Sequence, residues 1–322
     1  MLTWRKHGLI YSPQAHPPLI GGAGYAQSPQ ALVFDDFVRI YFSTREIDEK
    51  NNKFISRVSY VDMDKNLQEI LNVSAAPVID HAELGTFDEH GIFPFNVLRH
   101  NDAVMAWTTG WNRRVSVSVD TSIGLAISRD GGNTFQRHAT GPVMSASLHE
   151  PYLVGDAFVL HLEGRFHMWY IYGVGWKRQQ SDSPPDRVYK IAHAVSDDGI
   201  DWVRESKPII ADRLGDDECQ ALPTVIKVGN RYHMIFCYRE CFDFRLGAGR
   251  GYRLGYAWSD DLMTWHRDDS QVPAISEPGE WDSEMQCYPH LFRCDEKVYL
   301  LYNGNAFGKE GFGLAELTAC SE

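Results

Sequence analysis

The chain carries a pattern that returns about every 65 residues, and this spacing limits the folds open to it. Each copy begins with a polar stretch ending in proline and an apolar run. An aromatic-rich apolar run follows, and then a strand-like run with a turn. The proline anchors stand 65, 57, 72 and 66 residues apart, at Pro29, Pro94, Pro151, Pro223 and Pro289. Short strands repeated at this period predict a radial β array.

The third strand-like run of the copies ends in a recurring turn. In three copies the run leads into Ser-x-Asp, then to an aromatic residue, and two positions later to a basic residue. Ser and Asp side chains accept backbone N–H groups in such turns. The aromatic residue is expected to start an outer strand and to pack between blades. The basic residues are Arg137, Arg204 and Arg267.

The N-terminus resembles the outer strand of a later copy. Residues 3–6 read Thr-Trp-Arg-Lys, similar to Thr-Trp-His-Arg at 264–267, yet they precede the first copy. The last copy ends near Leu317 without an outer strand. We therefore expect residues 3–12 to supply it, which closes the ring and removes free sheet edges. The predicted fold is an all-β, five-bladed β-propeller forming one domain over residues 1–322, with an open tandem of β-sandwiches as the alternative.

Composition excludes several classes of partner. The 322 residues carry a formal charge of −12 and have a pI near 5.5, which argues against nucleic acid. No apolar stretch is long enough to span a membrane, and no apolar segment of a secretory signal follows Met1, so a cytoplasmic location is expected. Free thiols are favoured over a zinc site at Cys237 and Cys241. We expect no metal and no cofactor, with an axial cation or a phosphate left open.

The segments before the prolines are the candidates for a functional site, because a propeller gathers its innermost strands around one channel. A Glu stands five residues before the proline in three copies, at Glu89, Glu218 and Glu284, and Glu150 directly precedes Pro151. Converging carboxylates shift each other's pKa, so that one stays protonated while another stays ionised. The alternative is that the repeated Glu binds backbone N–H groups at each blade entry and is architectural.

These carboxylates suit the cleavage of a glycosidic bond, which requires an acid and a base or nucleophile. We predict Glu150 and Glu218 as the acid/base pair, with Asp88 or Glu89 as a third carboxylate. The residues predicted to bind substrate are Arg45, His90, Trp107, His149, Gln220, Arg239, Glu284, Gln286 and Asn303. The arginines suit an anionic group, with internal salt bridges as the alternative. Two long loops, at residues 177–187 and 242–251, are expected to wall the channel mouth.

The blade pattern and the run Ser-Asp-Asp-Gly-x-x-Trp at 196–202 resemble the five-bladed β-propeller glycosidase superfamily. This superfamily includes glycoside hydrolase families 43 and 32 and the mannoside phosphorylases of family 130. The resemblance covers nearly the whole chain and implies a hydrolase or a phosphorylase. Families 43 and 32 open the first blade with Asp-Pro, whereas this chain has Ser28-Pro29. Glu218-Cys219 resembles the Glu-Cys pair of invertase-like enzymes, one blade late. These departures favour a divergent member, on the phosphorylase-like side.

The predicted function is hydrolysis of a small glycoside or oligosaccharide by carboxylate acid/base catalysis at the channel mouth. A glycoside phosphorylase or glycosyl-transferring enzyme on the same scaffold is one alternative. A carbohydrate-binding propeller without chemistry is the other. The predicted partner in each case is a carbohydrate, with no nucleic acid and no membrane.

Overall fold

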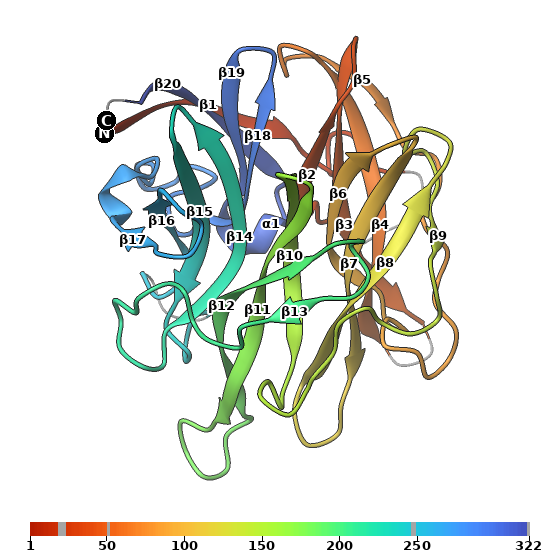
Figure 1. Cartoon of the computed structure of the whole chain (residues 1–322), viewed down its shortest axis with the longest axis vertical. Helices are drawn as coiled ribbons and strands as arrows, with labels where there is room; N and C mark the ends of the chain where they lie inside the picture. The colour runs from red at the N-terminus through yellow and green to blue at the C-terminus, as the bar shows by residue number, and fades with distance from the viewer. Residues whose placement is uncertain (19–23, 50–51, 246–248, 321–322) are drawn as a thin grey trace.

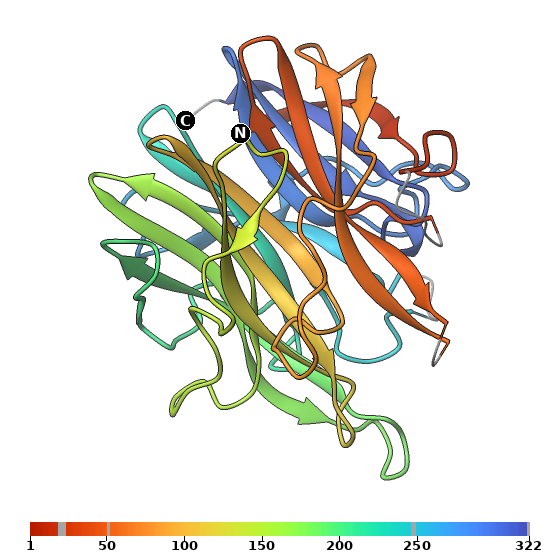
Figure 2. The same ribbon diagram turned by 90° about the vertical axis from the view of Figure 1, so that its right-hand side faces the viewer.

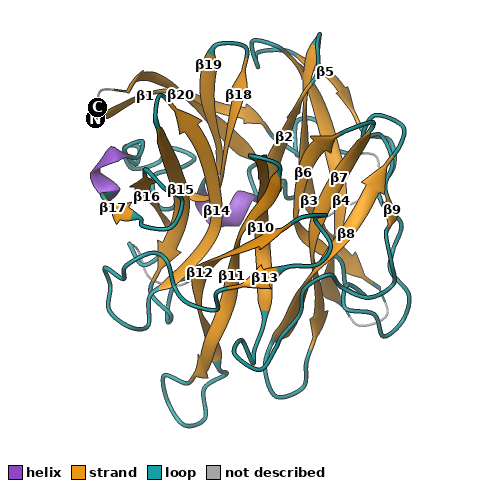
Figure 3. Ribbon diagram, in the orientation of Figure 1, coloured by secondary structure: helices purple, strands orange, loops and turns teal. Residues whose placement is uncertain are grey.

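The computed structural model describes residues 1–18, 24–49, 52–245 and 249–320. It contains five antiparallel sheets of four strands each. The sheets follow one another around a common centre (Figure 1). Within these described residues, helix is limited to α1 (Asn305–Gly308) and the 3₁₀ turn η1 (Asp269–Gln271), so strands and loops make up most of the ribbon (Figure 3). The predicted five-bladed β-propeller is confirmed.

Each sheet is one blade, and the strands run from the centre outwards. Blade 1 contains β2 (Gln27–Val33), β3 (Phe37–Asp48), β4 (Lys53–Asp64) and β5 (Ile70–Val73). Blade 2 contains β6 (Ile92–His100), β7 (Ala103–Arg113), β8 (Val119–Ser128) and β9 (Gln136–Arg137). Blade 3 contains β10 (Val154–Leu162), β11 (Arg165–Lys177), β12 (Asp186–Ser196) and β13 (Val203–Arg204).

Blade 4 contains β14 (Cys219–Val228), β15 (Arg231–Arg239), β16 (Arg253–Ser259) and β17 (His266–Arg267). Blade 5 contains β18 (Cys287–Cys294), β19 (Lys297–Asn303) and β20 (Phe312–Cys320), and its outermost strand is β1 (Leu2–Tyr11). The two ends of the chain therefore lie side by side (Figures 1 and 2).

Pairing of β1 with β20 confirms that the N-terminal segment completes the last blade. The register runs from Leu2 opposite Cys320 to Tyr11 opposite Phe312. The indole Nε1 of Trp4 donates to the backbone O of Gln271 at 2.7 Å, which ties the strand to the neighbouring blade. Without β1, strand β20 would present an unpaired edge to solvent.

The predicted turn chemistry is present in three blades. The Ser128 hydroxyl donates to the Asp130 carboxylate at 2.7 Å, and that carboxylate accepts the backbone N–H groups of Asn133 and Thr134. Ser196 with Asp198 and Ser259 with Asp261 repeat the contact at 2.9 and 3.0 Å. The hydrogen bonds outweigh the effect of burial and lower the pKa of Asp130 to about 2.

Every innermost strand has a register shift near its start, which turns one residue toward the axis. Four blades place a residue with positive φ there: Ser28, Asp156, Leu222 and Tyr288. Proline follows in three of them, whereas Ala157 follows Asp156. The third anchor, Pro151, is therefore wrong, because it precedes β10 and the equivalent residue is Ala157.

Large aromatic side chains fill the space between the blades. Trp107 and Trp169 are fully buried, and Trp107 donates through Nε1 to the backbone O of Gly199 at 2.9 Å. Within the portion of the chain that the structure covers, no helix is long and apolar enough to cross a membrane.

Candidate active site

A cavity of about 570 Å³ lies on the axis, at the end where the innermost strands begin. All five blades contribute to its wall. Phe93, Asp156, Leu222 and Tyr288 reach it from the shifted starts of β6, β10, β14 and β18, and Gln27 reaches it from β2. The β7–β8 and β11–β12 hairpins extend from this same end (Figure 1, bottom). The bulges that interrupt the ladders thus build the floor of the cavity.

Asp156 provides the carboxyl group of this wall. It is 8% exposed, and its backbone N–H donates to the Thr109 hydroxyl at 2.7 Å. Its Oδ2 accepts the backbone N–H of Leu222 at 3.3 Å. Burial raises the pKa of Asp156 to about 7, against the weaker opposing effects of that hydrogen bond and of the Arg187 charge. Near neutral pH the group is therefore present both as an acid and as a carboxylate.

Four arginines face the same cavity: Arg45, Arg187, Arg239 and Arg245. No carboxylate among the described residues lies within ion-pair distance of any of these four guanidinium groups. Burial lowers the pKa of Arg45, and the charges of Arg245 and Arg187 lower it further. Partial burial lowers the pKa of Arg245, and Arg187 and Arg239 add to this. The wall is therefore cationic, in a protein whose formal net charge is −12.

Aromatic residues hold Arg239 in place. Its Nη2 donates to the Tyr189 hydroxyl at 3.0 Å, and its Cζ lies 3.5 Å from the Phe244 ring centroid. Its Nη1 donates to two backbone carbonyls. Its Nε is buried and has no hydrogen-bond partner in the described structure. A buried donor without a partner is uncommon in folded proteins.

The predicted catalytic carboxylates lie elsewhere. Asp88, Glu150 and Glu218 are each at most 1% exposed, and none lines the axial cavity. Each one binds the arginine of the outermost strand in its own blade. The pairs are Asp88 with Arg137 at 2.8 Å, Glu150 with Arg204 at 2.6 Å, and Glu218 with Arg267 at 2.6 Å.

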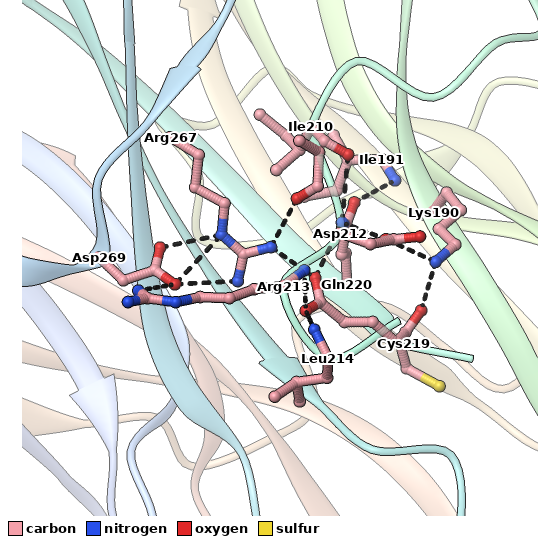
Figure 4. Close-up of polar contacts among 12 residues, drawn as sticks. Lys190, Ile191, Ile210, Asp212, Arg213, Leu214, Cys219, Gln220, Arg267 and Asp269 are labelled. Carbon is pink, nitrogen blue, oxygen red and sulfur yellow. Dashed lines mark hydrogen bonds and ion pairs between the residues drawn. The ribbon is translucent and has the colours of Figure 1, made fainter. Parts of the chain in front are cut away.

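Glu218 shows how complete this engagement is. Its Oε1 accepts from Arg267 and from Gln220 Nε2 at 3.0 Å. Its Oε2 accepts the backbone N–H groups of Arg213 and Leu214, each at 2.9 Å. Figure 4 shows Arg267 lying between Asp269 and the loop that carries these two residues. The contacts favour the architectural alternative for Glu218, and its catalytic role stays a prediction that no contact with the cavity supports.

Blade 5 has an equivalent carboxylate that the sequence pattern missed. Asp282 is fully buried, binds Lys6 of β1 at 2.6 Å and accepts from Gln286 at 2.9 Å. Glu284, which the spacing selects, is exposed. Glu89 is half-buried, and its Oε2 accepts the backbone N–H of Gly85 at 3.2 Å. Neither Glu284 nor Glu89 lines the axial cavity.

Two of the predicted substrate-binding residues, Arg45 and Arg239, line the cavity. Gln220 and Gln286 hold the buried carboxylates of their blades. Three others lie apart from the wall and have other contacts or are exposed. His90 stacks on Trp111 with ring centroids 5.6 Å apart, Trp107 packs in the core, and His149 is exposed.

Asn303 is buried and donates to the backbone O of Ala26 and Gly311, each at 2.7 Å. It closes the contact between blades 5 and 1, outside the cavity wall.

The sequence pattern did not single out Asp156 or Arg187. Arg187 and Arg245 belong to the two loops expected to wall the mouth, and both line it. Asp156 is equivalent to Ser28 in the repeat, since each directly precedes the anchor residue of its blade. This equivalence is visible only when Ala157, not Pro151, is taken as the anchor of the third blade. In the described part of the chain, no cluster of three or more His, Cys, Asp or Glu residues has a metal-binding arrangement.

Solved structures define the class of the fold. A glycoside hydrolase superposes with a TM-score of 0.71 at 16% identity, covering 98% of this chain and 92% of that one. A thermostable family-43 glycoside hydrolase gives 0.65 at 13% identity, with coverages of 94% and 95%. A structure from the GH130 family of mannoside phosphorylases, described as containing glycoside hydrolases that target β-1,2 mannosidic linkages, gives 0.62 at 14% identity, with coverages of 91% and 84%. The fold is that of the five-bladed propeller glycosidases.

No protein-family model matches the chain. The uncharacterized protein Rv1502 of Mycobacterium tuberculosis is 31% identical over 321 residues, which cover 98% of this chain and 99% of the relative. The chain belongs to the same family as this mycobacterial protein. A β-1,2-mannobiose phosphorylase of Thermoanaerobacter sp. is 29% identical over 119 residues, covering 35% of this chain and 37% of that enzyme.

Proposed function

We propose that this protein cleaves a glycosidic bond in the axial cavity by phosphorolysis, with Asp156 as the general acid. The observation that carries the proposal is a single carboxyl group facing four arginines. Hydrolases of this superfamily type require two carboxyl groups at the scissile bond. The described wall contains Asp156 alone, and residues 19–23, 50–51 and 246–248 include no Asp or Glu in sequence.

Phosphate removes the need for a second carboxyl group, because it is already an anionic nucleophile. In the proposed step a phosphate oxygen forms a bond to the anomeric carbon while the bond from that carbon to the glycosidic oxygen breaks. The Asp156 carboxyl proton passes to the leaving oxygen. The products are a sugar 1-phosphate and the shortened glycan, and Asp156 regains its proton from solvent.

The electrostatics of the cavity fit both parts of this step. A general acid works best when its pKa is near the working pH, and burial raises the pKa of Asp156 to about 7. Guanidinium groups bind phosphate oxygens through charge-assisted hydrogen bonds, and they stabilise charge in the transition state. Similarity to the β-1,2-mannobiose phosphorylase over 119 residues supports the same choice of nucleophile.

Hydrolysis, the function first predicted from the sequence, is the second candidate. It would need a base other than Glu150 or Glu218, since both are buried and hydrogen-bonded away from the cavity. The cytoplasmic location also stays a prediction.

The test is a set of paired reactions, with and without inorganic phosphate, on β-linked mannobioses and other small oligosaccharides. Phosphorus NMR would follow sugar 1-phosphate. Formation of sugar 1-phosphate that requires phosphate and is lost in Asp156→Asn supports the proposal. Release of free sugar at the same rate without phosphate establishes hydrolysis. Binding without release on any substrate favours the non-catalytic propeller.

A further inference from the structure

The cavity holds more positive charge than one phosphate neutralises. Four guanidinium groups line it, and the facing carboxyl, Asp156, is partly protonated near pH 7. A bound phosphate brings about two negative charges. Burial lowers the pKa of Arg45, and the charges of Arg245 and Arg187 lower it further, because like charges withdrawn from water disfavour each other. A second anionic group in the cavity would remove this cost.

Arg45 belongs to a different blade from the other three arginines. Arg187, Arg239 and Arg245 come from β12, from the end of β15 and from the loop after it, so they gather on blades 3 and 4. Arg45 lies on β3 of blade 1, whose innermost strand contacts those of blades 2 and 5. Arg45 therefore approaches the cavity from a different blade than the other three arginines.

The guanidinium group of Arg45 is oriented in advance. Its Nε donates to Gln27 Oε1 at 2.8 Å, and Gln27 Nε2 donates to the backbone O of Phe307 at 2.6 Å. Gln27 is 1% exposed. No described residue accepts a hydrogen bond from either Nη group of Arg45. Such a held fork matches two oxygens of a carboxylate or of a phosphate.

Resting on the proposed function, we infer that the glycoside substrate is itself acidic and that Arg45 binds its carboxylate or phosphate monoester. Phe54 lies beside the guanidinium, with 5.7 Å between the Arg45 Cζ and the ring centroid, and Tyr25 packs edge-on to Phe54 at 6.2 Å. Both rings line the cavity and offer apolar faces to the sugar that carries the acid. Gln27 acts as a positioning residue for Arg45.

The experiment measures sugar binding by isothermal titration calorimetry at saturating inorganic phosphate. The acidic probes are glucuronate, galacturonate, glucose 6-phosphate and mannose 6-phosphate. Each is compared with its neutral parent sugar. At least one acidic probe is expected to bind about tenfold more tightly than its parent. The uronates and the sugar phosphates form separate arms, so the tighter arm identifies which acid the site selects.

Two substitutions of Arg45 test its role. Arg45→Gln should abolish the preference for the acidic probe and leave the affinity for the neutral sugar unchanged. Arg45→Lys keeps a point charge without the fork, so it should retain more of the preference for sugar phosphates than for uronates. Arg165→Gln, a change at an exposed arginine paired with Asp197, is the matched control and should behave as the unaltered protein.

Equal affinity for acidic and neutral probes, or an acid preference that survives in Arg45→Gln, overturns the inference. The phosphorus NMR assay separates this result from the proposed function, because it detects sugar 1-phosphate independently of acid selection. If sugar 1-phosphate never forms but Arg45 still selects acidic sugars, phosphorolysis fails and the acidic subsite stands. If sugar 1-phosphate forms from neutral glycosides with no acid preference, phosphorolysis stands and the acidic subsite fails.

Discussion

Arg267 Nη1 lies 2.6 Å from Glu218 Oε1 and joins the outermost strand of blade 4 to the loop that enters its innermost strand. The two residues are 49 positions apart in the sequence. Blades 2 and 3 repeat the contact with Arg137 and Arg204, and blade 5 repeats it with Lys6 from the N-terminal strand. The recurring basic residue and the recurring acid thus form one ion pair that joins the outermost strand of each of these blades to the segment entering its innermost strand.

Glu218→Gln should destabilise the protein rather than disable the chemistry. The change removes one of the two carboxylates that neutralise Arg267, and breaking a buried ion pair costs at most about 3–5 kcal/mol. Urea unfolding measures the loss. A variant with unchanged stability and a hundredfold lower turnover would instead restore the catalytic role first predicted for Glu218.

Asp156→Asn should remove activity while leaving the fold intact. Loss of a general acid typically lowers the rate by about 10²–10⁴-fold. In the unaltered protein the rate should fall as pH rises through about 7, because the proton that the leaving oxygen needs is then lost. The pH dependence of kcat/KM measures this. An Asn variant with the same falling limb would assign the titration to another group.

His290 should make the fold sensitive to acid. It is 3% exposed beside Phe158, with ring centroids 5.9 Å apart, and burial lowers its pKa to about 3 from 6.5. Between these values the unfolded chain binds a proton that the native state does not. The contribution is therefore complete above pH 6.5 and falls by on the order of 5 kcal/mol as the pH drops to about 3.

The measurement for His290 is the midpoint of acid unfolding, followed by circular dichroism. His290→Leu should move the midpoint to lower pH, and His138→Gln, at an exposed position, should leave it in place. Identical midpoints in all three proteins would mean that His290 does not control acid unfolding.

Gly313→Ala should destabilise blade 5. A Cβ at Gly313 would meet the Trp281 ring at 2.3 Å and the backbone O of Gly8 at 2.5 Å. Overpacking of this kind typically costs about 1–3 kcal/mol. Thermal unfolding is the measurement, and Gly141→Ala is the control because nothing lies within 4 Å of its Cβ. Equal losses of Tm in both variants would contradict the argument from Trp281.

The sequence by itself determined the blades. Strand alternation, the Ser-x-Asp turn at Ser128 and the return of the pattern about every 65 residues are local features, so they can be read along the chain. The similarity of residues 3–6 to residues 264–267 is also a local feature, and it predicted the closing strand because equivalent strands pack in equivalent ways. Arg45 and Arg239, which the sequence placed near the channel mouth, both line the axial cavity.

Only the tertiary structure decided which carboxyl faces the axis. The spacing drew attention to Glu150 and Glu218, but their direction depends on the arginine that reaches them across the blade. Asp156 reaches the cavity because a bulge with positive φ turns it inward, and no proline marks that position. A side chain's direction at a strand entry depends on backbone geometry and on partners about 50 residues away, and a linear repeat records neither.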